Sequence, residues 1–196
     1  MVTLDDMANI DRGPLFVSAT AEEAAHLPQD ARVLVTGIGT INCAVKLCRA
    51  IEGHRPSRLI NLGTAGALRD GLSGVFEISS VLQHDFSGEL IAQMTGKPFP
   101  NEVGLDTATD LPTARLATGD AFISDSEVRD RLGERADLVD MEGYAVARVG
   151  RAYGIPVTLL KQVSDSADES AKRTWFDAVD RGARELATVV GKLEMV

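Results

Sequence analysis

The sequence predicts a single α/β domain with a central, mixed and mostly parallel sheet flanked by helices. Three observations lead to this prediction. Short, unbroken apolar runs, typical of strands buried on both faces, alternate along the chain with segments of helical periodicity. A length of 196 residues suits one domain with a substantial core. Hydrophobic residues make up 44% and charged residues 25% of the chain, as in ordinary globular proteins.

The elements follow a loosely held tail over residues 1–13, and the domain is expected to span residues 14–196. Strands are expected at apolar runs such as VLVT and PVTLLKQV, over residues 14–19, 33–36, 58–62, 75–82, 115–118, 138–141 and 156–163. Helices are expected over residues 21–27, 43–51, 124–132, 142–153 and 173–193, the third opened by an S-x-x-E capping box. Residues 83–112 hold prolines and glycines close together, which predicts a long loop with partial structure.

Charge and cysteine content exclude several classes of partner. The net charge of −9 and the pI of about 4.8 argue against nucleic acid and anionic membranes, since both call for clustered Lys and Arg. No apolar run has the length of a membrane-spanning helix, and the N-terminus does not resemble a secretory signal. Cys43 and Cys48 are interpreted as small core residues in a reducing cytoplasm. The three histidines are scattered, so neither a metal site nor a cofactor is predicted.

Two glycine-containing segments follow predicted strands, and each has two possible interpretations. GIGTIN (residues 37–42) lies between a strand and a helix, as a nucleotide loop or a tight turn would. It lacks the third glycine of a dinucleotide fingerprint and the lysine of a P-loop. GTAG (residues 63–66) would let backbone amides approach a ligand, or would simply fit a crowded sheet edge.

Three carboxylates lie at the predicted carboxyl ends of separate strands. Glu23 belongs to a T-x-x-E capping box, and Asp165, beside Ser164, could form a turn or an N-cap. Glu142 lies at a strand-to-helix junction, where a helix N-terminus tolerates charge. Ligands bind at the carboxyl ends of strands in such folds, and carboxylates gathered in one cleft suit general acid–base chemistry.

Five motifs occur in an order that resembles the purine nucleoside phosphorylase superfamily. They are TGIG (36–39), GTAG (63–66), TGDAFI (118–123), VDMEG (139–143) and VSDSAD (163–168). Within that superfamily the chain looks most like the 5′-methylthioadenosine/S-adenosylhomocysteine nucleosidases, over about residues 14–195. The resemblance implies a nucleoside phosphorylase-like α/β fold, a homodimer and a small-molecule nucleoside substrate.

The resemblance also implies roles for the acidic residues and their neighbours. Asp165 matches the aspartate that protonates the purine at N7, and Ser164 supports it. Glu142 matches the glutamate that binds the ribose hydroxyls, and Met141 packs on the sugar. Glu23 matches the glutamate that activates water. Asp165 must then hold a proton when the base leaves.

The same comparison implies the remaining contacts to substrate. Phe122 matches the aromatic residue that stacks on the purine, and the backbone of Ile123 reads the edge of the base. Thr64, Ala65 and Gly66 are expected in the substrate-binding wall.

Hydrolysis is predicted over phosphorolysis because the arginines that hold phosphate in related phosphorylases are replaced. Glu23 lies in the region where the first of these arginines is expected. Asn61, just before the LGTAG run, lies where the second arginine is expected. Two departures from the pattern of the family affect the expected substrate preference. Only residues 28–32 separate the first helix from the TGIG strand, so the hairpin that the family has there is missing. Residues 83–112 are also short compared with the same region of the family. The alternatives are a nucleosidase for another substrate such as futalosine, a phosphorylase, or a non-catalytic nucleoside-binding protein.

Overall fold

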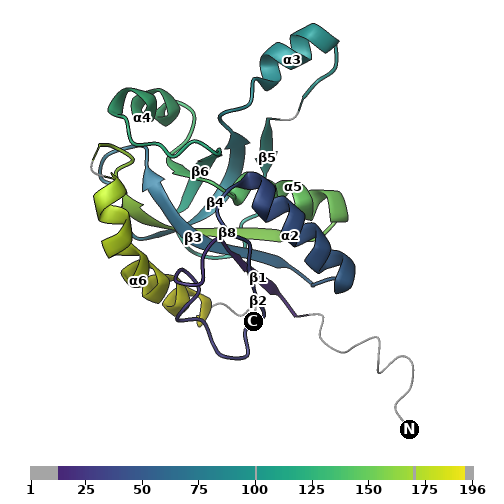
Figure 1. Ribbon diagram of the computed structural model, residues 1–196, viewed down its shortest axis with the longest axis vertical. Coiled ribbons are helices and arrows are strands. Elements are labelled where there is room, and N and C mark those ends of the chain that lie inside the picture. Colours follow the sequence, from purple (N-terminus) through teal and green to yellow (C-terminus); the bar gives the residue numbers. More distant parts are fainter. Residues whose placement is uncertain (1–12, 100, 170, 193–196) are drawn as a thin grey trace.

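The computed structural model of the protein describes residues 13–99, 101–169 and 171–192 (Figure 1). The expected tail therefore lies, apart from Gly13, outside the described residues. The described strands are β1 (Leu15–Ser18), β2 (Val33–Val35), β3 (Leu59–Ala67), β4 (Val75–Gln83), β5 (Glu102–Gly104), β6 (Thr113–Thr118), β7 (Leu138–Asp140) and β8 (Val157–Asp165). The described helices are α2 (Thr40–Gly53), α3 (Gly88–Thr95), α4 (Ser126–Gly133), α5 (Gly143–Tyr153) and α6 (Ala171–Val190).

The strands form one mixed sheet that closes on itself. β3 pairs with β8, β8 with β4, β4 with β6, β6 with β7, and β7 again with β3. β1 and β2 extend the sheet from β3 in parallel, and β5 extends it from β4. The predicted α/β domain with a mixed, mostly parallel sheet is confirmed. The closure of β3, β8, β4, β6 and β7 into a ring, which leaves β2 and β5 as edge strands, was not predicted.

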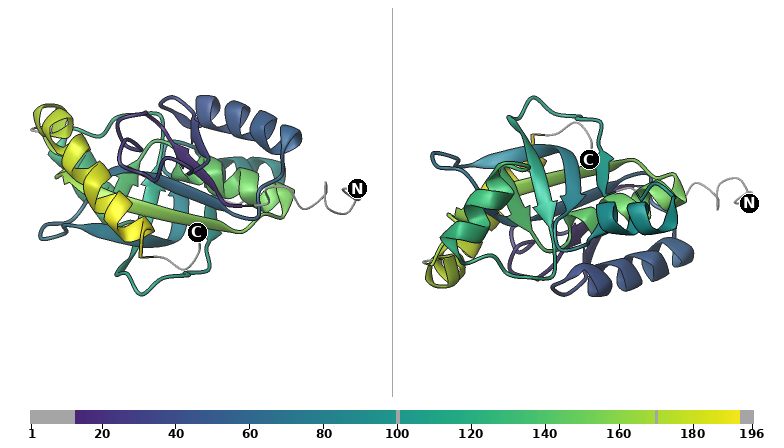
Figure 2. Two further views of the ribbon diagram at one scale, coloured as in Figure 1. Left: turned by 90° about the horizontal axis from the view of Figure 1, so that it is seen from below. Right: turned by 90° about the horizontal axis from the view of Figure 1, so that it is seen from above.

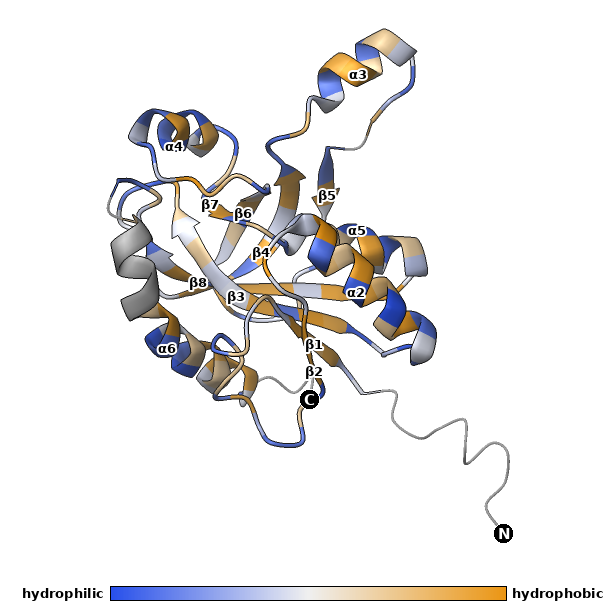
Figure 3. Ribbon diagram, in the orientation of Figure 1, coloured by the Kyte–Doolittle hydropathy of each residue, from blue (hydrophilic) through white to orange (hydrophobic). Residues whose placement is uncertain are grey.

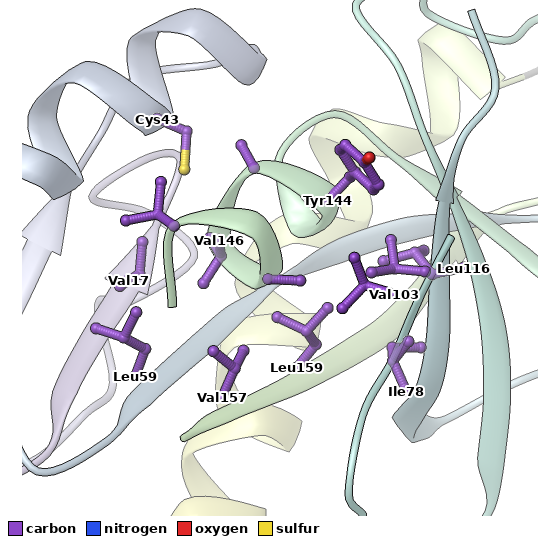
Figure 4. Close-up of a cluster of buried hydrophobic side chains, with 14 of the residues drawn as sticks. Val17, Cys43, Leu59, Ile78, Val103, Leu116, Tyr144, Val146, Val157 and Leu159 are labelled. Carbon is purple, nitrogen blue, oxygen red and sulfur yellow. The ribbon is translucent and has the colours of Figure 1, made fainter. Parts of the chain in front are cut away.

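Helices cover the sheet on two sides, and each side has its own apolar cluster. α6 packs on β8 and β3, whereas α5 packs on β3, β4, β6 and β8 with α2 against it (Figure 2). Alternate residues of β3 face the two sides: Leu59 joins the cluster beneath α2 and α5, and Ile60 joins the one beneath α6. Figure 4 shows the larger cluster, in which Cys43 and Tyr144 pack with Leu159. The prediction that Cys43 is a core residue is therefore correct.

The sequence predicts that the GTAG segment follows a strand, but the segment is part of that strand. Residues 63–66 lie inside β3, which continues to Ala67. This half of β3 pairs with β8 on one side and, at its end, with β7 on the other, so its backbone groups have partners. A register shift occurs between Ala65 and Gly66. A Cβ at Gly66 would lie 2.9 Å from Ala167 Cβ, which explains the need for a glycine there.

Two local predictions need correction, and a third is made specific. Residues 21–27 form consecutive turns with bonds such as Ala24 N–H to Ala21 O (3.2 Å), because so short a segment cannot sustain a helix alone. The N-cap of α4 is Asp125, whose side chain accepts from Val128 N–H, so Ser124 does not open a capping box. Within residues 83–112, the partial structure consists of α3 and β5.

In the part of the chain that the structure describes, no helix combines the length and the apolar character needed to cross a membrane.

Candidate active site

A cavity of about 240 Å³ lies where the carboxyl ends of β1, β3 and β8 meet the segments that follow β6 and β7. All the residues that the sequence predicts as catalytic or substrate-binding line it, namely Glu23, Thr64, Ala65, Gly66, Phe122, Ile123, Met141, Glu142, Ser164 and Asp165. Its other lining residues are Ala19, Thr20, Ile38, Ala121, Val139 and Asp140. The structure therefore brings the predicted residues together, while their individual roles stay predictions.

Glu23 is buried, and both of its carboxylate oxygens accept hydrogen bonds. Oε1 accepts from the backbone N–H of Thr64 at 2.8 Å and from its Oγ1 at 2.9 Å. Oε2 accepts from Thr20 N–H at 3.3 Å, and Glu23 N–H donates to Thr20 Oγ1 at 3.3 Å. These reciprocal bonds are those of a capping box, so Glu23 both caps its turn and faces the cavity.

Glu142 occupies the N-cap position of α5, and its carboxylate reaches across to α2. Oε1 accepts from the backbone N–H of Gly39 at 2.7 Å. Burial raises the pKa of Glu142 to about 7; the Asp140 and Glu23 carboxylates add to the rise, while Lys161 and the Gly39 N–H oppose it. Glu142 therefore changes charge near neutral pH.

Asp140 and Lys161 form an ion pair behind the cavity, and both side chains are 1% exposed. Lys161 Nζ lies 2.8 Å from Asp140 Oδ2, and Asp140 also accepts from Thr118 Oγ1 at 2.5 Å and from Gly143 N–H at 2.8 Å. Burial works to lower the pKa of Lys161, but Asp140, Glu142 and Glu23 outweigh it and raise that pKa, so the lysine stays protonated. Asp140 thus stabilises the buried lysine next to Glu142.

Lys161 was not among the residues predicted from the sequence. The available signal was a single lysine inside the apolar strand PVTLLKQV, because a fully buried Lys needs a charged partner.

Asp165, the last residue of β8, is fixed by short local bonds. Oδ2 accepts from Ser164 Oγ at 2.6 Å, and Oδ1 accepts from Ala167 N–H at 2.8 Å. Ala167 has a φ of 51°, a left-handed conformation that is uncommon outside glycine, so the turn is held against its own backbone preference. The Ser164 hydroxyl and the Ala167 N–H therefore orient the carboxyl group of Asp165, and neither of these two partners is a cation.

The remaining wall is mostly apolar. Phe122 is 45% exposed at the rim, whereas Ile123 next to it is buried. Ile38, from the glycine turn before α2, is 49% exposed and lines the cavity too. Such a wall suits a planar base and an apolar substituent rather than a highly charged ligand. Within the described ranges, no His, Cys, Asp and Glu side chains are grouped in a way that could hold a metal ion.

The fold and the site together define a class: α/β proteins that gather several carboxylates in one cleft at the ends of their strands. Comparison with known proteins makes this specific. The family model of the phosphorylase superfamily matches residues 27–193. A 5′-methylthioadenosine/S-adenosylhomocysteine nucleosidase of Exiguobacterium sp. is 30% identical over 179 residues, which cover 81% of this chain and 77% of that protein. One from Halalkalibacterium halodurans is 26% identical over 185 residues, covering 82% and 80%.

Solved structures agree with this fold. The Helicobacter pylori 5′-methylthioadenosine/S-adenosylhomocysteine nucleosidase, in complex with a substituted pyrrolidin-3-ol, superposes with a TM-score of 0.79 at 19% identity, covering 92% of this chain and 98% of that chain. The futalosine hydrolase of the same organism gives a TM-score of 0.80 at 20% identity, covering 91% and 95%. The chain belongs to the phosphorylase superfamily and, within it, to the family of 5′-methylthioadenosine/S-adenosylhomocysteine nucleosidases.

Proposed function

We propose that the protein is a nucleosidase that hydrolyses the N-glycosidic bond of a purine ribonucleoside, with 5′-methylthioadenosine and S-adenosylhomocysteine as the first candidate substrates. The observation that carries this proposal is the gathering of Glu23, Glu142 and Asp165 around one cavity of about 240 Å³. Family membership supports the reaction class, N-ribosyl hydrolysis.

At the base end of the cavity, Asp165 acts as the general acid. A purine anion is a poor leaving group, so a proton must reach N7 as the bond between C1′ and N9 breaks. Ser164 and the Ala167 N–H hold the carboxyl group in place for this transfer, and Phe122 stacks on the base. Ile123 offers its backbone to the edge of the purine.

At the sugar end, two carboxylates face the cation that develops on the ribose. Glu142 binds the ribose hydroxyls, and Met141 packs on the ring. Glu23 takes a proton from the water that attacks C1′. Carboxylate charge near an oxocarbenium-like sugar stabilises it, as in glycoside hydrolysis.

Gly63 lets Glu23 and the buried lysine approach the strand closely. A Cβ at Gly63 would lie 3.2 Å from Glu23 Oε1 and 3.3 Å from Lys161 Nζ, which is tighter than an ordinary contact. A residue without a side chain therefore fits beside these two groups. Lys161 in turn helps to hold the negative charge around the reacting sugar.

Hydrolysis is favoured over phosphorolysis by the charge of the lining. None of the described residues that line the cavity is an arginine or a lysine, whereas three are glutamate or aspartate residues with proposed catalytic roles. Glu23 would repel phosphate at the place where a nucleophile approaches. The exposed rim formed by Ile38 and Phe122 would admit 5′ substituents of different size, which keeps futalosine as a second candidate substrate.

Base release measured by chromatography tests this proposal. The protein is incubated with 5′-methylthioadenosine, S-adenosylhomocysteine, adenosine, inosine and futalosine, each with and without phosphate. We expect free base without phosphate, and a decrease in kcat of about 10³-fold in Asp165→Asn, within the usual range for loss of general acid catalysis. Phosphate-dependent turnover to a sugar 1-phosphate would make the protein a phosphorylase. Thermal stabilisation by a nucleoside without base release would make it a binding protein.

The proposal includes a homodimer in the cytoplasm. Ile41 and Val45 lie one turn apart in α2 and are 74% and 53% exposed, and Ile38, in the turn before this helix, is 49% exposed. Figure 3 shows apolar residues along α2. Because Ile38 also lines the cavity, a second copy on this surface would lie beside the active site. Light scattering should give about twice 20.9 kDa, and Ile41→Glu should shift the protein toward the monomer.

Cys43 and Cys48 are free, as in reducing compartments, and cell fractionation tests the location.

A further inference from the structure

The N-terminus of α2 carries no cap of its own. Its N-cap residue is Gly39, which has no side chain to accept a hydrogen bond, and its first turn contains no acidic residue. The first backbone N–H groups of a helix need acceptors from elsewhere, and negative charge is favourable there. Two carboxylates from distant segments supply them.

Each carboxylate takes one N–H group. Glu142 accepts from Gly39 N–H at 2.7 Å, and Asp120 accepts from Thr40 N–H at 2.7 Å through Oδ1. Asp120 Oδ2 also accepts from Thr40 Oγ1 at 2.6 Å. Asp120 thus holds Thr40 through two short bonds, although it is an exposed residue 80 positions away.

Asp120 is itself held from the other side. Its N–H donates to Asp85 Oδ2 at 2.7 Å, just beyond the end of β4. The preceding Gly119 lies against His84, where a Cβ would be 2.4 Å from Nε2, so the turn rests directly on this strand end. Phe122 follows Asp120 by two residues and lines the cavity. One short turn therefore connects the proposed base-stacking residue to the helix whose N-terminus binds the proposed ribose-binding carboxylate.

From this geometry we propose that Asp120 is a positioning residue: it holds the N-terminus of α2 so that Gly39 N–H meets Glu142, and it thereby sets the distance between the base-binding and sugar-binding walls. This inference rests on the proposed nucleosidase function. Asp120 acts through Gly39 and Phe122, and it is not among the lining residues of the cavity.

A pH profile distinguishes positioning from simple helix capping. The groups that face Glu142 are the Gly39 N–H and the neutral Cys43 thiol on α2, Asp140 on β7, Lys161 on β8 and Glu23 after β1. Of these, the Gly39 N–H is the one that Asp120 holds in place through the adjacent Thr40. Because that N–H stabilises the Glu142 carboxylate, its displacement should move the acidic limb of kcat/KM to higher pH.

The test compares Asp120→Ala with a matched capping variant. Asp125 caps α4 through Val128 N–H at 2.9 Å and does not line the cavity, so Asp125→Ala removes a helix cap away from the site. We expect Asp120→Ala to lower kcat/KM by about 10- to 100-fold, as is usual when a group that orients a site residue is lost. Its acidic limb should move upward, whereas Asp125→Ala should lower the melting temperature only.

Two further variants keep the test decisive. Asp120→Asn retains an acceptor for Thr40 N–H and should recover most of the lost kcat/KM, and Thr40→Ala, which removes only the Oγ1 bond, should give a smaller loss of the same kind. If Asp120→Ala does not fold, these two variants decide. A lowered melting temperature with an unchanged kcat/KM and pH profile in the Asp120 variants would overturn the inference. If the wild-type protein releases no base, the proposed function fails, and calorimetric affinity for 5′-methylthioadenosine then tests Asp120: equal affinity in the variants would overturn the inference.

Discussion

At the sugar end of the cavity the carboxylates are buried around a single lysine, whereas at the base end Asp165 is only half-buried and is held by a hydroxyl and a backbone N–H. The two ends are separated along β3, since Gly63 lies beside Glu23 and Gly66 lies beside Asp165. Three residues of strand correspond to about 10 Å. One pocket therefore combines two electrostatic environments: buried carboxylates around a lysine at the sugar end, and a half-buried carboxyl group with neutral donors at the base end.

The difference matches what each end has to do. A developing sugar cation is stabilised by negative charge that is excluded from water. One lysine, Lys161, stabilises several buried carboxylates, so the net charge of this group of side chains stays negative. A general acid must instead gain and lose a proton repeatedly, so it benefits from an oriented carboxyl group in contact with solvent. Removing the lysine should therefore affect stability most, and removing the support of Asp165 should affect mainly the rate.

Lys161→Met should cause the largest loss of stability, about 3–5 kcal/mol in the free energy of unfolding, because Asp140 would remain buried without its cation. Urea denaturation at pH 7 measures this loss. The double variant Lys161→Met/Asp140→Asn should recover a large part of it, since Asp140 then no longer carries an unpaired charge. A single variant that loses less than about 1 kcal/mol would show that Lys161 does not stabilise the buried carboxylates.

Glu142→Gln should have opposite effects on activity and stability. Burial raises the pKa of Glu142 from its ordinary value of 4.5 to about 7, so the folded protein holds this proton more tightly than the unfolded chain does. The resulting stability is fully present below pH 4.5 and is lost as the pH rises through 7. At pH 8 the glutamine should therefore stabilise the protein by about 3 kcal/mol while kcat/KM falls about 100-fold.

Unfolding at pH 4.5 and at pH 8 checks this prediction, and the wild-type kcat/KM should fall as the pH drops below about 7. Glu127→Gln on the exposed first turn of α4 is a matched control that should leave both quantities unchanged. An equal stability difference between Glu142→Gln and the wild type at both pH values would contradict the assignment of a raised pKa.

Ser164→Ala should have the smallest effect, a decrease in kcat of about fivefold, which corresponds to the loss of one hydrogen bond worth about 1 kcal/mol. The reason is that Asp165 loses the bond from Ser164 Oγ but keeps the one from Ala167 N–H. Ser126→Ala breaks a similar bond to Glu169 on the surface and serves as the control in single-turnover measurements. A change in stability at constant kcat would mean that Ser164 supports the strand end and not the acid.

Much of the fold followed from local patterns. Unbroken apolar runs predicted the strands, and their alternation with helical periodicity predicted a mostly parallel sheet, because both signals depend on residues close together in the chain. The rule that ligands bind at the carboxyl ends of strands predicted that Glu23 and Asp165 lie in one place. This prediction is correct because β1, β3 and β8 are mutually parallel, so their carboxyl ends meet at one edge of the sheet. The helix predicted over residues 21–27 was wrong because that segment is too short to be governed by local preference.

The sequence by itself determined the strand and helix pattern and the residue types at the strand ends. Only the tertiary structure decided how the charges are paired. β7 runs antiparallel to β3, and its pairing at Gly66 and Ala67 is what brings Glu142 to the cavity. The bonds from Gly39 N–H to Glu142 and from Thr40 N–H to Asp120 join residues 103 and 80 positions apart. The pKa of a carboxylate and the partner of a buried lysine depend on burial and on distances between remote segments, and these exist only once the chain has closed its sheet.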